Sequence, residues 1–271
     1  SLTLAPIGDI ADLPPWHRQA RREVGTDAAT EAEYRKVLAI YYGMIRYIDE
    51  EMARLHAALD ERGMLENTWI ILGSDHGDYT GEKGLFNKSE SLYKCLLHVP
   101  LIIVPPKGTT EPGPRTVEGM TSTIDLFPTI LEIAGIEPGE NQGKSLLDWV
   151  RSGHQTPLRD AIFAQIGDYH GFIRTSWPTG MPASGRHASL THCIRTKTHA
   201  YILDPDNGDE AYDLVQDPNE LHNLLNPDRP ELNNDFKDLK QRLAGFIDEC
   251  DRLKNRLGVV SGDRGFVEGW E

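Results

Sequence analysis

Cysteine is scarce in this sequence, and the little that is present forms no pattern. The 271 residues contain three cysteines, Cys95, Cys193 and Cys250, which lie far apart and show no metal-ligand spacing. This count excludes a disulfide-rich scaffold and a cysteine-based zinc site. We expect three free thiols, with one disulfide as the alternative.

Positive charge is also in short supply. Lys and Arg number 28 against 42 Asp and Glu, which gives a formal net charge of −14. Such a balance argues against a protein that binds nucleic acid or an anionic membrane. An anionic ligand would therefore have to be held by a local positive group, such as a metal ion or a lysine.

Long apolar runs are missing as well. No stretch approaches the roughly 18 apolar residues of a membrane-spanning helix, so no membrane span is expected. No signal-peptide pattern follows Ser1, but the compartment stays open, because a chain can begin inside a longer protein. Hydrophobic residues still make up 39% of the sequence and aromatic residues 8%, which is enough for an ordinary core. The length of 271 residues fits one large domain or two smaller ones.

The most informative stretch covers residues 68–88, TWIILGSDHGDYTGEKGLFNK. The apolar run at 69–72 predicts a buried strand of the kind found in parallel sheets, whose carboxyl ends collect ligands. Asp75 and His76 follow it, and the conformational freedom of Gly77 would let both side chains serve one site. A carboxylate beside an imidazole suits a divalent cation. A plain turn at the end of a strand is the alternative.

Strands and helices alternate in the first part of the chain. The capping-box pattern Thr30-x-x-Glu33 opens a stripe of apolar residues at spacings of four and three, which predicts a long helix over 30–62 that packs on a sheet. Residues 100–104 predict a second buried strand, and Asp125 is expected to cap the helix that follows it. The sequence therefore predicts an α/β domain over residues 1–158.

The second part of the chain has a different pattern. Short strands are expected at 161–166, 190–196, 200–203 and 211–214, followed by an amphipathic terminal helix. These elements predict a small α+β domain over residues 159–271, with an antiparallel sheet covered by that helix. Residues 167–188 predict a long loop, which is a candidate for lining a substrate cleft.

Taken together, these motifs resemble the sulfatase family of the alkaline-phosphatase-like superfamily. The resemblance rests on SDHG at 74–77, GEKGLFNK at 81–88 and HVPLII at 98–103. It implies that residues 1–158 are the C-terminal part of a mixed or parallel sheet sandwiched by helices. It also implies that Asp75 and His76 bind a divalent cation, with Ca²⁺ expected and Mg²⁺ or Mn²⁺ as alternatives, and that Lys88 is a catalytic residue that contacts the sulfate. The loop holds further charged candidates at Asp78, Glu82, Lys83 and Glu90.

One family motif is missing from the sequence. Sulfatases carry a Cys- or Ser-x-Pro-x-Arg segment, whose first residue becomes formylglycine, and no such segment occurs here. We therefore expect the C-terminal half of a sulfatase, which is inactive alone and holds a metal weakly with two ligands. The formylglycine and the N-terminal half of the fold would lie elsewhere, and the substrate would be a sulfate-ester small molecule or carbohydrate.

Two other functions remain open at this point. Phosphonate and phosphate monoester hydrolases share the implied fold and the adjacent Asp-His pair. A non-catalytic binding or structural subunit would keep the fold without the nucleophile.

Overall fold

The structure, a computed structural model, describes residues 2–9, 13–88, 91–109, 113, 116–152, 157–167, 190–225 and 236–257. The chain forms two compact units. The first comprises Ser1–Ile7, Arg21–Lys88 and Lys94–Ile162, and the second Gly8–Ala20, Ser89–Tyr93 and Phe163–Glu271. The domain boundary at 158/159 stays a prediction. The candidate cleft loop lies almost wholly outside the described residues, as does Glu90.

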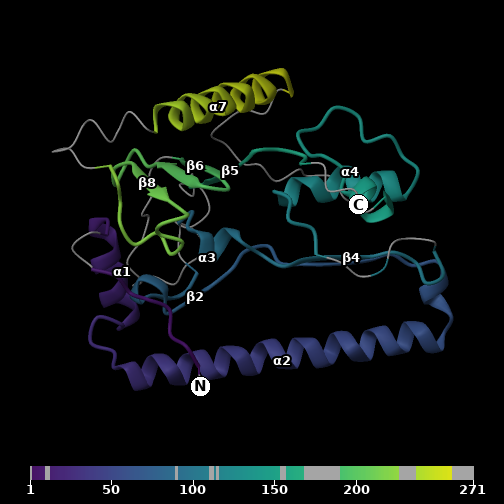
Figure 1. Cartoon of the computed structure of the whole chain (residues 1–271), viewed down its shortest axis with the longest axis horizontal. Coiled ribbons are helices and arrows are strands. Elements are labelled where there is room, and N and C mark those ends of the chain that lie inside the picture. The colour runs from purple at the N-terminus through teal and green to yellow at the C-terminus, as the bar shows by residue number, and fades with distance from the viewer. Residues whose placement is uncertain are drawn as a thin grey trace, which may run out of the picture. The chain divides into compact units, whose positions relative to one another are not determined.

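The first unit is built on a long unbroken helix, α2 (Glu31–Glu61) (Figure 1). Its predicted capping box is present: the Thr30 backbone N–H donates to the Glu33 carboxylate at 2.7 Å, and Glu33 N–H donates to the Thr30 hydroxyl at 3.4 Å. Tyr34 and Leu38 are buried. The predicted packing of the whole stripe on a sheet is wrong for this chain, because Ile45 and Ile48 further along are 46% and 57% exposed.

The remaining elements of this unit are short. They are η1 (Met64–Glu66), β1 (Ile70–Gly73), β2 (Tyr79–Thr80), η2 (Glu82–Gly84), β3 (Phe86–Asn87), α3 (Lys94–Leu97), β4 (Leu101–Val104), η3 (Thr123–Asp125), α4 (Leu126–Ile133) and α5 (Leu147–Ser152). A further helix, α1 (Pro15–Val24), begins in the second unit and ends in the first.

The two apolar strands pair differently from the prediction. β1 and β4 form a two-stranded antiparallel sheet, with Ile70 opposite Val104 and Gly73 opposite Leu101. Neither strand is buried on both faces, since β1 is half-buried and Ile102 and Val104 are exposed. A short apolar run does not distinguish a parallel strand from an antiparallel one.

Asp125 has a different role from the one expected. Asp125 occupies the N-cap position of α4, as expected, but its side chain makes no capping hydrogen bond there. Ser122 instead caps the preceding turn η3, and its backbone N–H donates to the Asp125 carboxylate at 2.8 Å. The carboxylate, which is fully buried, also accepts from the Lys144 backbone N–H at 2.8 Å and from both terminal nitrogens of Arg159. Asp125 therefore ties the start of α4 to two later segments of the same unit.

The second unit is a four-stranded antiparallel sheet covered by a helix. The sheet has the order β5 (Ala161–Ile166), β6 (Thr191–Thr196), β7 (His199–Leu203) and β8 (Glu210–Asp213), and β5 starts at the boundary with the first unit. The terminal helix α7 (Lys237–Leu257) lies on β6 and β7 (Figure 1). The rings of Phe246 and Phe163 stack at 4.3 Å between centroids. These strands and this helix are confirmed.

The core of the second unit contains a buried polar network. The Arg195 guanidinium pairs with Glu220 at 2.5 Å. Tyr93 donates to Glu210 at 2.6 Å and lies 3.0 Å from Nε2 of His17. Because a buried charge is costly unless it is paired, these contacts hold the sheet and its flanking segments in one arrangement.

Candidate active site

A small hairpin brings Lys88 back to the end of β1. β2 pairs with β3 so that Tyr79 faces Asn87 and Thr80 faces Phe86. The same register, continued by one residue, sets Asp78 opposite Lys88. The hairpin is anchored on α2, where the Tyr34 hydroxyl donates to Gly84 O at 3.1 Å. This antiparallel return explains why residues 76 and 88 meet.

The Asp75–His76 turn is fixed by the close approach of the backbone at Gly77. Gly77 N–H donates to Leu96 O in α3 at 2.7 Å, and a Cβ added at Gly77 would lie 2.0 Å from Cys95 O. The backbone of Gly77 does not have a positive φ, so it does not need the conformational freedom of glycine. The expectation that Gly77 supplies conformational freedom is therefore wrong, because the reason for glycine here is lack of space.

The three predicted site residues converge. Nε2 of His76 lies 3.7 Å from Oδ2 of Asp75 and 3.2 Å from Nζ of Lys88. The other ring nitrogen, Nδ1, lies 2.7 Å from Gly77 O, and His76 N–H donates to Oδ1 of Asp75 at 3.0 Å. One edge of the imidazole is thus held by backbone, while the opposite edge faces a carboxylate and an amine.

The electrostatics of the turn favour a charged Asp75. The pKa of Asp75 is lowered, chiefly by the neighbouring His76 side chain, then by backbone N–H groups and by Lys88. Asp78 behaves differently, because burial raises its pKa while His76 and Lys88 pull in the other direction. Its Oδ1 is buried and has no hydrogen-bond partner in the described part of the chain. Burial, then Asp78 and Glu82, raise the pKa of Tyr41 on α2.

The Asp75–His76 pair has the donor chemistry for part of a divalent-cation site. Metal–ligand bonds of about 2.0–2.6 Å allow two donors 3.7 Å apart to reach one ion. The Asp75 side chain is 87% exposed, so its Oδ2 is accessible. No cluster of three or more His, Cys, Asp or Glu suited to a metal occurs among the described residues. These two ligands alone leave the coordination shell of such an ion incomplete.

Two of the other loop candidates, Glu82 and Lys83, contribute to the hairpin itself. Glu82 accepts from Thr80 N–H at 2.6 Å and from its hydroxyl. Lys83 is 1% exposed and has a positive φ of 54° within the tight turn. Sequence reasoning missed the burial of Lys83 and the hairpin itself, although Tyr-Thr and Phe-Asn on either side of a Gly-Glu-Lys-Gly turn are a hairpin signal.

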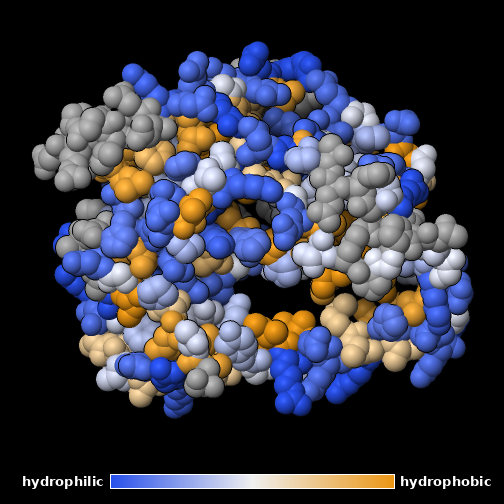
Figure 2. Space-filling view, in the orientation of Figure 1, coloured by the Kyte–Doolittle hydropathy of each residue, from blue (hydrophilic) through white to orange (hydrophobic). Residues whose placement is uncertain are grey.

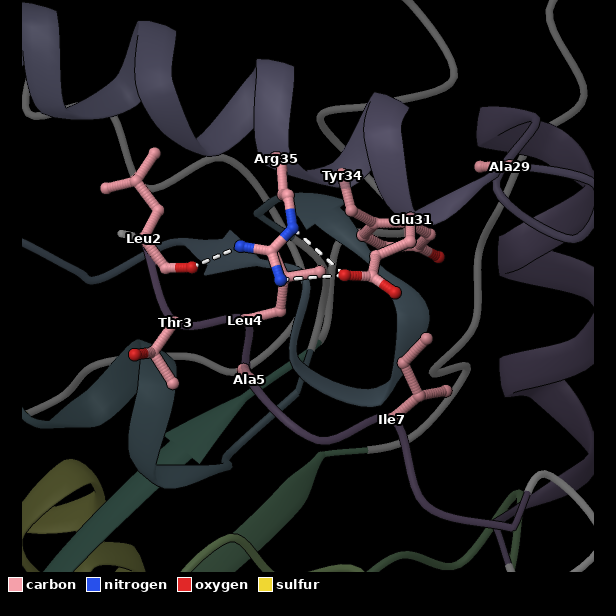
Figure 3. Close-up of a pocket in the computed structure, with 9 residues that line it drawn as sticks. All are labelled: Leu2, Thr3, Leu4, Ala5, Ile7, Ala29, Glu31, Tyr34 and Arg35. Atoms are coloured by element: carbon pink, nitrogen blue, oxygen red, sulfur yellow. Dashed lines mark hydrogen bonds and ion pairs between the residues drawn. The ribbon is translucent and has the colours of Figure 1, made fainter.

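A separate pocket of ≈ 590 Å³ lies at the start of α2. Figure 3 shows the 2–7 segment along one side and Glu31, Tyr34 and Arg35 along the other. Arg35 bonds Glu31 at 2.7 Å and the carbonyl of Leu2. Its charge is therefore neutralised within the chain, and none of the predicted site residues lines this pocket.

The structure also tests the predictions about the cysteines and about membrane-spanning helices. The three cysteines form no disulfide with one another, as expected. No helix in the described part of the chain is long and apolar enough to cross a bilayer.

Comparison with protein families gives two overlapping matches. The family model "Sulfatase" matches residues 14–136. The model "N-sulphoglucosamine sulphohydrolase, C-terminal" matches residues 81–249, which is more than half of the chain.

Individual relatives match most of the chain. The chain is 27% identical over 249 residues to the uncharacterized sulfatase YidJ of Escherichia coli (91% of this chain, 44% of the relative). It is 31% identical over 230 residues to an arylsulfatase of Clostridium perfringens (81% and 44%). The chain thus spans less than half the length of these curated relatives.

Solved structures show the same fold. The phosphonate monoester hydrolase of Agrobacterium radiobacter matches with a TM-score of 0.61 and 28% identity, over 76% of this chain and 41% of that one. A phosphonate monoester hydrolase from Silicibacter pomeroyi matches with a TM-score of 0.69 and 23% identity, over 94% and 50%. This likeness confirms the predicted α/β fold class, although β1 and β4 pair with each other in the antiparallel direction.

Proposed function

Because this chain belongs to the sulfatase family, we propose that it supplies the C-terminal half of a divalent-metal-dependent sulfuric ester hydrolase. The observation that carries the proposal is the convergence of Asp75, His76 and Lys88, which a hairpin brings together across 12 residues. In this half, Asp75 and His76 help to hold the cation. Ca²⁺ is the expected ion, with Mg²⁺ and Mn²⁺ as alternatives.

Each group has a distinct role in the proposed reaction. A bound divalent cation would polarise the oxygens of the sulfate group. Lys88 places an ammonium where negative charge grows on the sulfuryl group or on the leaving oxygen. The formylglycine that the family uses as its nucleophile would come from the part of the fold outside these 271 residues. The chain alone is therefore inactive in this proposal.

An exposed apolar surface on the first unit supports a partner for this half of the fold. α2 has a second apolar stripe formed by Val37, Ile40, Met44 and Tyr47, which are 39%, 57%, 52% and 63% exposed. Apolar side chains are visible along α2 at the lower edge of Figure 2. Burying each half-exposed side chain would contribute on the order of 1 kcal/mol. The proposed occupant is the N-terminal half of the same fold.

A charge substitution on this stripe tests the occupant. Replacing Ile40 and Met44 together by Lys should hardly change the urea midpoint of the 271-residue chain, because both side chains are already exposed. The protein encoded by the complete reading frame should lose several kcal/mol, because two charges would be buried. Equal effects on both proteins would refute this assignment. If the isolated chain forms a dimer and the substitutions dissociate it, a second copy of the chain would be the occupant instead.

Parallel assays test the reaction. The protein from the complete reading frame should hydrolyse 4-nitrophenyl sulfate faster than the matching phosphate or phosphonate esters, and a chelator should abolish turnover. Lys88→Ala should lose activity. Lys107→Ala is the matched control, since Lys107 is an exposed lysine whose partner is Asp60 at 2.7 Å. Full activity in Lys88→Ala would overturn the role of Lys88.

The second candidate is hydrolysis of phosphonate or phosphate monoesters. It is favoured by the 28% identity to a phosphonate monoester hydrolase, and charge neutralisation by a cation and a lysine suits either ester. Faster turnover of the phosphorus esters would select it. A folded protein that turns over none of the three esters would favour the non-catalytic subunit.

A further inference from the structure

The tautomer of His76 follows from its backbone contact. Nδ1 lies 2.7 Å from Gly77 O, and a carbonyl oxygen can only accept a hydrogen bond. Nδ1 therefore carries the hydrogen. In the neutral ring, Nε2 then has one lone pair, directed away from the Gly77 backbone.

Two groups lie around that single lone pair. The Lys88 ammonium, which can only donate, is 3.2 Å from Nε2. Oδ2 of Asp75 lies 3.7 Å from the same nitrogen. A cation bound jointly by Asp75 and His76 must use the Nε2 lone pair, and so does the hydrogen bond from Lys88. Both cannot be formed at once, and two positive charges at such a separation also repel each other.

The Lys88 side chain is able to change partner while its backbone stays in place. Lys88 is exposed, and its backbone N–H donates to Oδ1 of Asn87 at 2.8 Å. Asn87 itself is held in β3 opposite Tyr79. A change of side-chain rotamer therefore moves the amine without breaking the hairpin.

We propose that Lys88 and the divalent cation are mutually exclusive partners of His76 Nε2, so that binding of the cation releases the Lys88 amine to the anionic group of the substrate. This inference rests on the proposed function, because it concerns the same cation and the same lysine. It adds an order of events: the cation binds first, and Lys88 becomes available to an oxyanion afterwards. Lys88 then opposes cation binding in the absence of substrate.

Calcium titration of the complete protein is the first test. Lys88→Met keeps the length of the side chain and removes the donor, so Ca²⁺ should bind about 3- to 10-fold more tightly than to the wild type. Lys88→Arg keeps both charge and donor and should bind Ca²⁺ like the wild type. Lys107→Met is the control, and it should not change the affinity. Unchanged affinity in Lys88→Met would overturn the inference.

The second test separates competition for the lone pair from simple charge repulsion. The ¹⁵N shift of His76 Nε2, assigned with His76→Gln, should differ between wild type and Lys88→Met without Ca²⁺. At saturating Ca²⁺ the two shifts should coincide, because Lys88 no longer contacts the ring. Shifts that coincide without Ca²⁺, or differ with it, would overturn the inference while leaving the proposed function intact. A wild-type protein that binds no Ca²⁺, Mg²⁺ or Mn²⁺ would overturn both.

Discussion

Replacing Gly77 by alanine tests whether the turn that carries Asp75 and His76 is fixed by close packing against α3. The new Cβ would lie 2.0 Å from Cys95 O, 3.0 Å from the Cys95 carbonyl carbon and 3.2 Å from Cα of Leu96. All three are backbone atoms, so no side-chain rotation relieves the clash. Because non-bonded heavy atoms are most stable at about 3.5 Å, the turn would have to move by about 1.5 Å.

The cost can be worked out from these contacts. Such a movement breaks the hydrogen bond from Gly77 N–H to Leu96 O, which measures 2.7 Å and contributes about 1 kcal/mol. Strain from overpacking adds about 1–3 kcal/mol. We expect Gly77→Ala to lower the free energy of unfolding by about 2–4 kcal/mol. The Gly77 carbonyl that orients His76 would move too, so cation binding should weaken with stability.

Urea unfolding followed by circular dichroism measures this loss, and the chain provides a matched control. Gly43 lies inside α2 and has nothing within 4 Å of an added Cβ. Gly43→Ala should therefore raise stability by about 0.5–1 kcal/mol, because alanine is the better helix former. A Gly77→Ala protein as stable as the wild type would refute the steric account of this turn.

The remaining predictions concern buried groups of the second unit. Burial raises the pKa of the Cys193 thiol from 9.0 to about 12. At pH 8, iodoacetamide should therefore modify the half-buried Cys95 and Cys250 in the native protein and Cys193 only in urea; native labelling of Cys193 would contradict its burial. The folded protein thus keeps the Cys193 thiol protonated at pH values at which the thiol of the unfolded chain ionises. The contribution of Cys193 to the free energy of unfolding should therefore be fully present below about pH 9 and should fall as the pH rises towards 12. Arg195→Met should lower the free energy of unfolding by about 3–5 kcal/mol, because it leaves the Glu220 carboxylate buried without its cation; a loss below about 1 kcal/mol would show that the pair is not buried.

Periodicity and local pairing signals in the sequence were sufficient to predict much of the fold. The long α2 helix follows from the spacing of its apolar residues and from the capping box at Thr30 and Glu33. The β7–β8 hairpin follows from the Asn207-Gly208 turn. These features depend on residues that are close in sequence, where side-chain spacing determines which face is apolar.

Features that depend on residues far apart in the sequence could not be predicted in the same way. The antiparallel pairing of β1 with β4 joins residues about thirty positions apart and leaves no mark in either strand. The fourfold hydrogen bonding of Asp125 requires Lys144 and Arg159, which no local pattern connects to it. Tertiary contacts decide such partners, and a carboxylate at the start of a helix fits both a cap and a buried ion pair.

Part of the candidate site could be predicted from the sequence. Asp75 and His76 are adjacent in sequence, so only a change in backbone direction was needed to bring them together. Lys88 came from the family resemblance, and the contact between Nζ and Nε2 at 3.2 Å depends on the hairpin register. The role of Gly77 could not be predicted, because the space around it is defined by α3.

The most direct test of the site is the calcium content and sulfate-ester turnover of Asp75→Ala in the protein from the complete reading frame. Asp60→Ala is the matched control, since Asp60 is an exposed carboxylate on α2 that pairs with Lys107 at 2.7 Å. The account predicts that Asp75→Ala loses bound calcium and turnover together, while Asp60→Ala keeps both. An Asp75→Ala protein with wild-type calcium and wild-type turnover would contradict it.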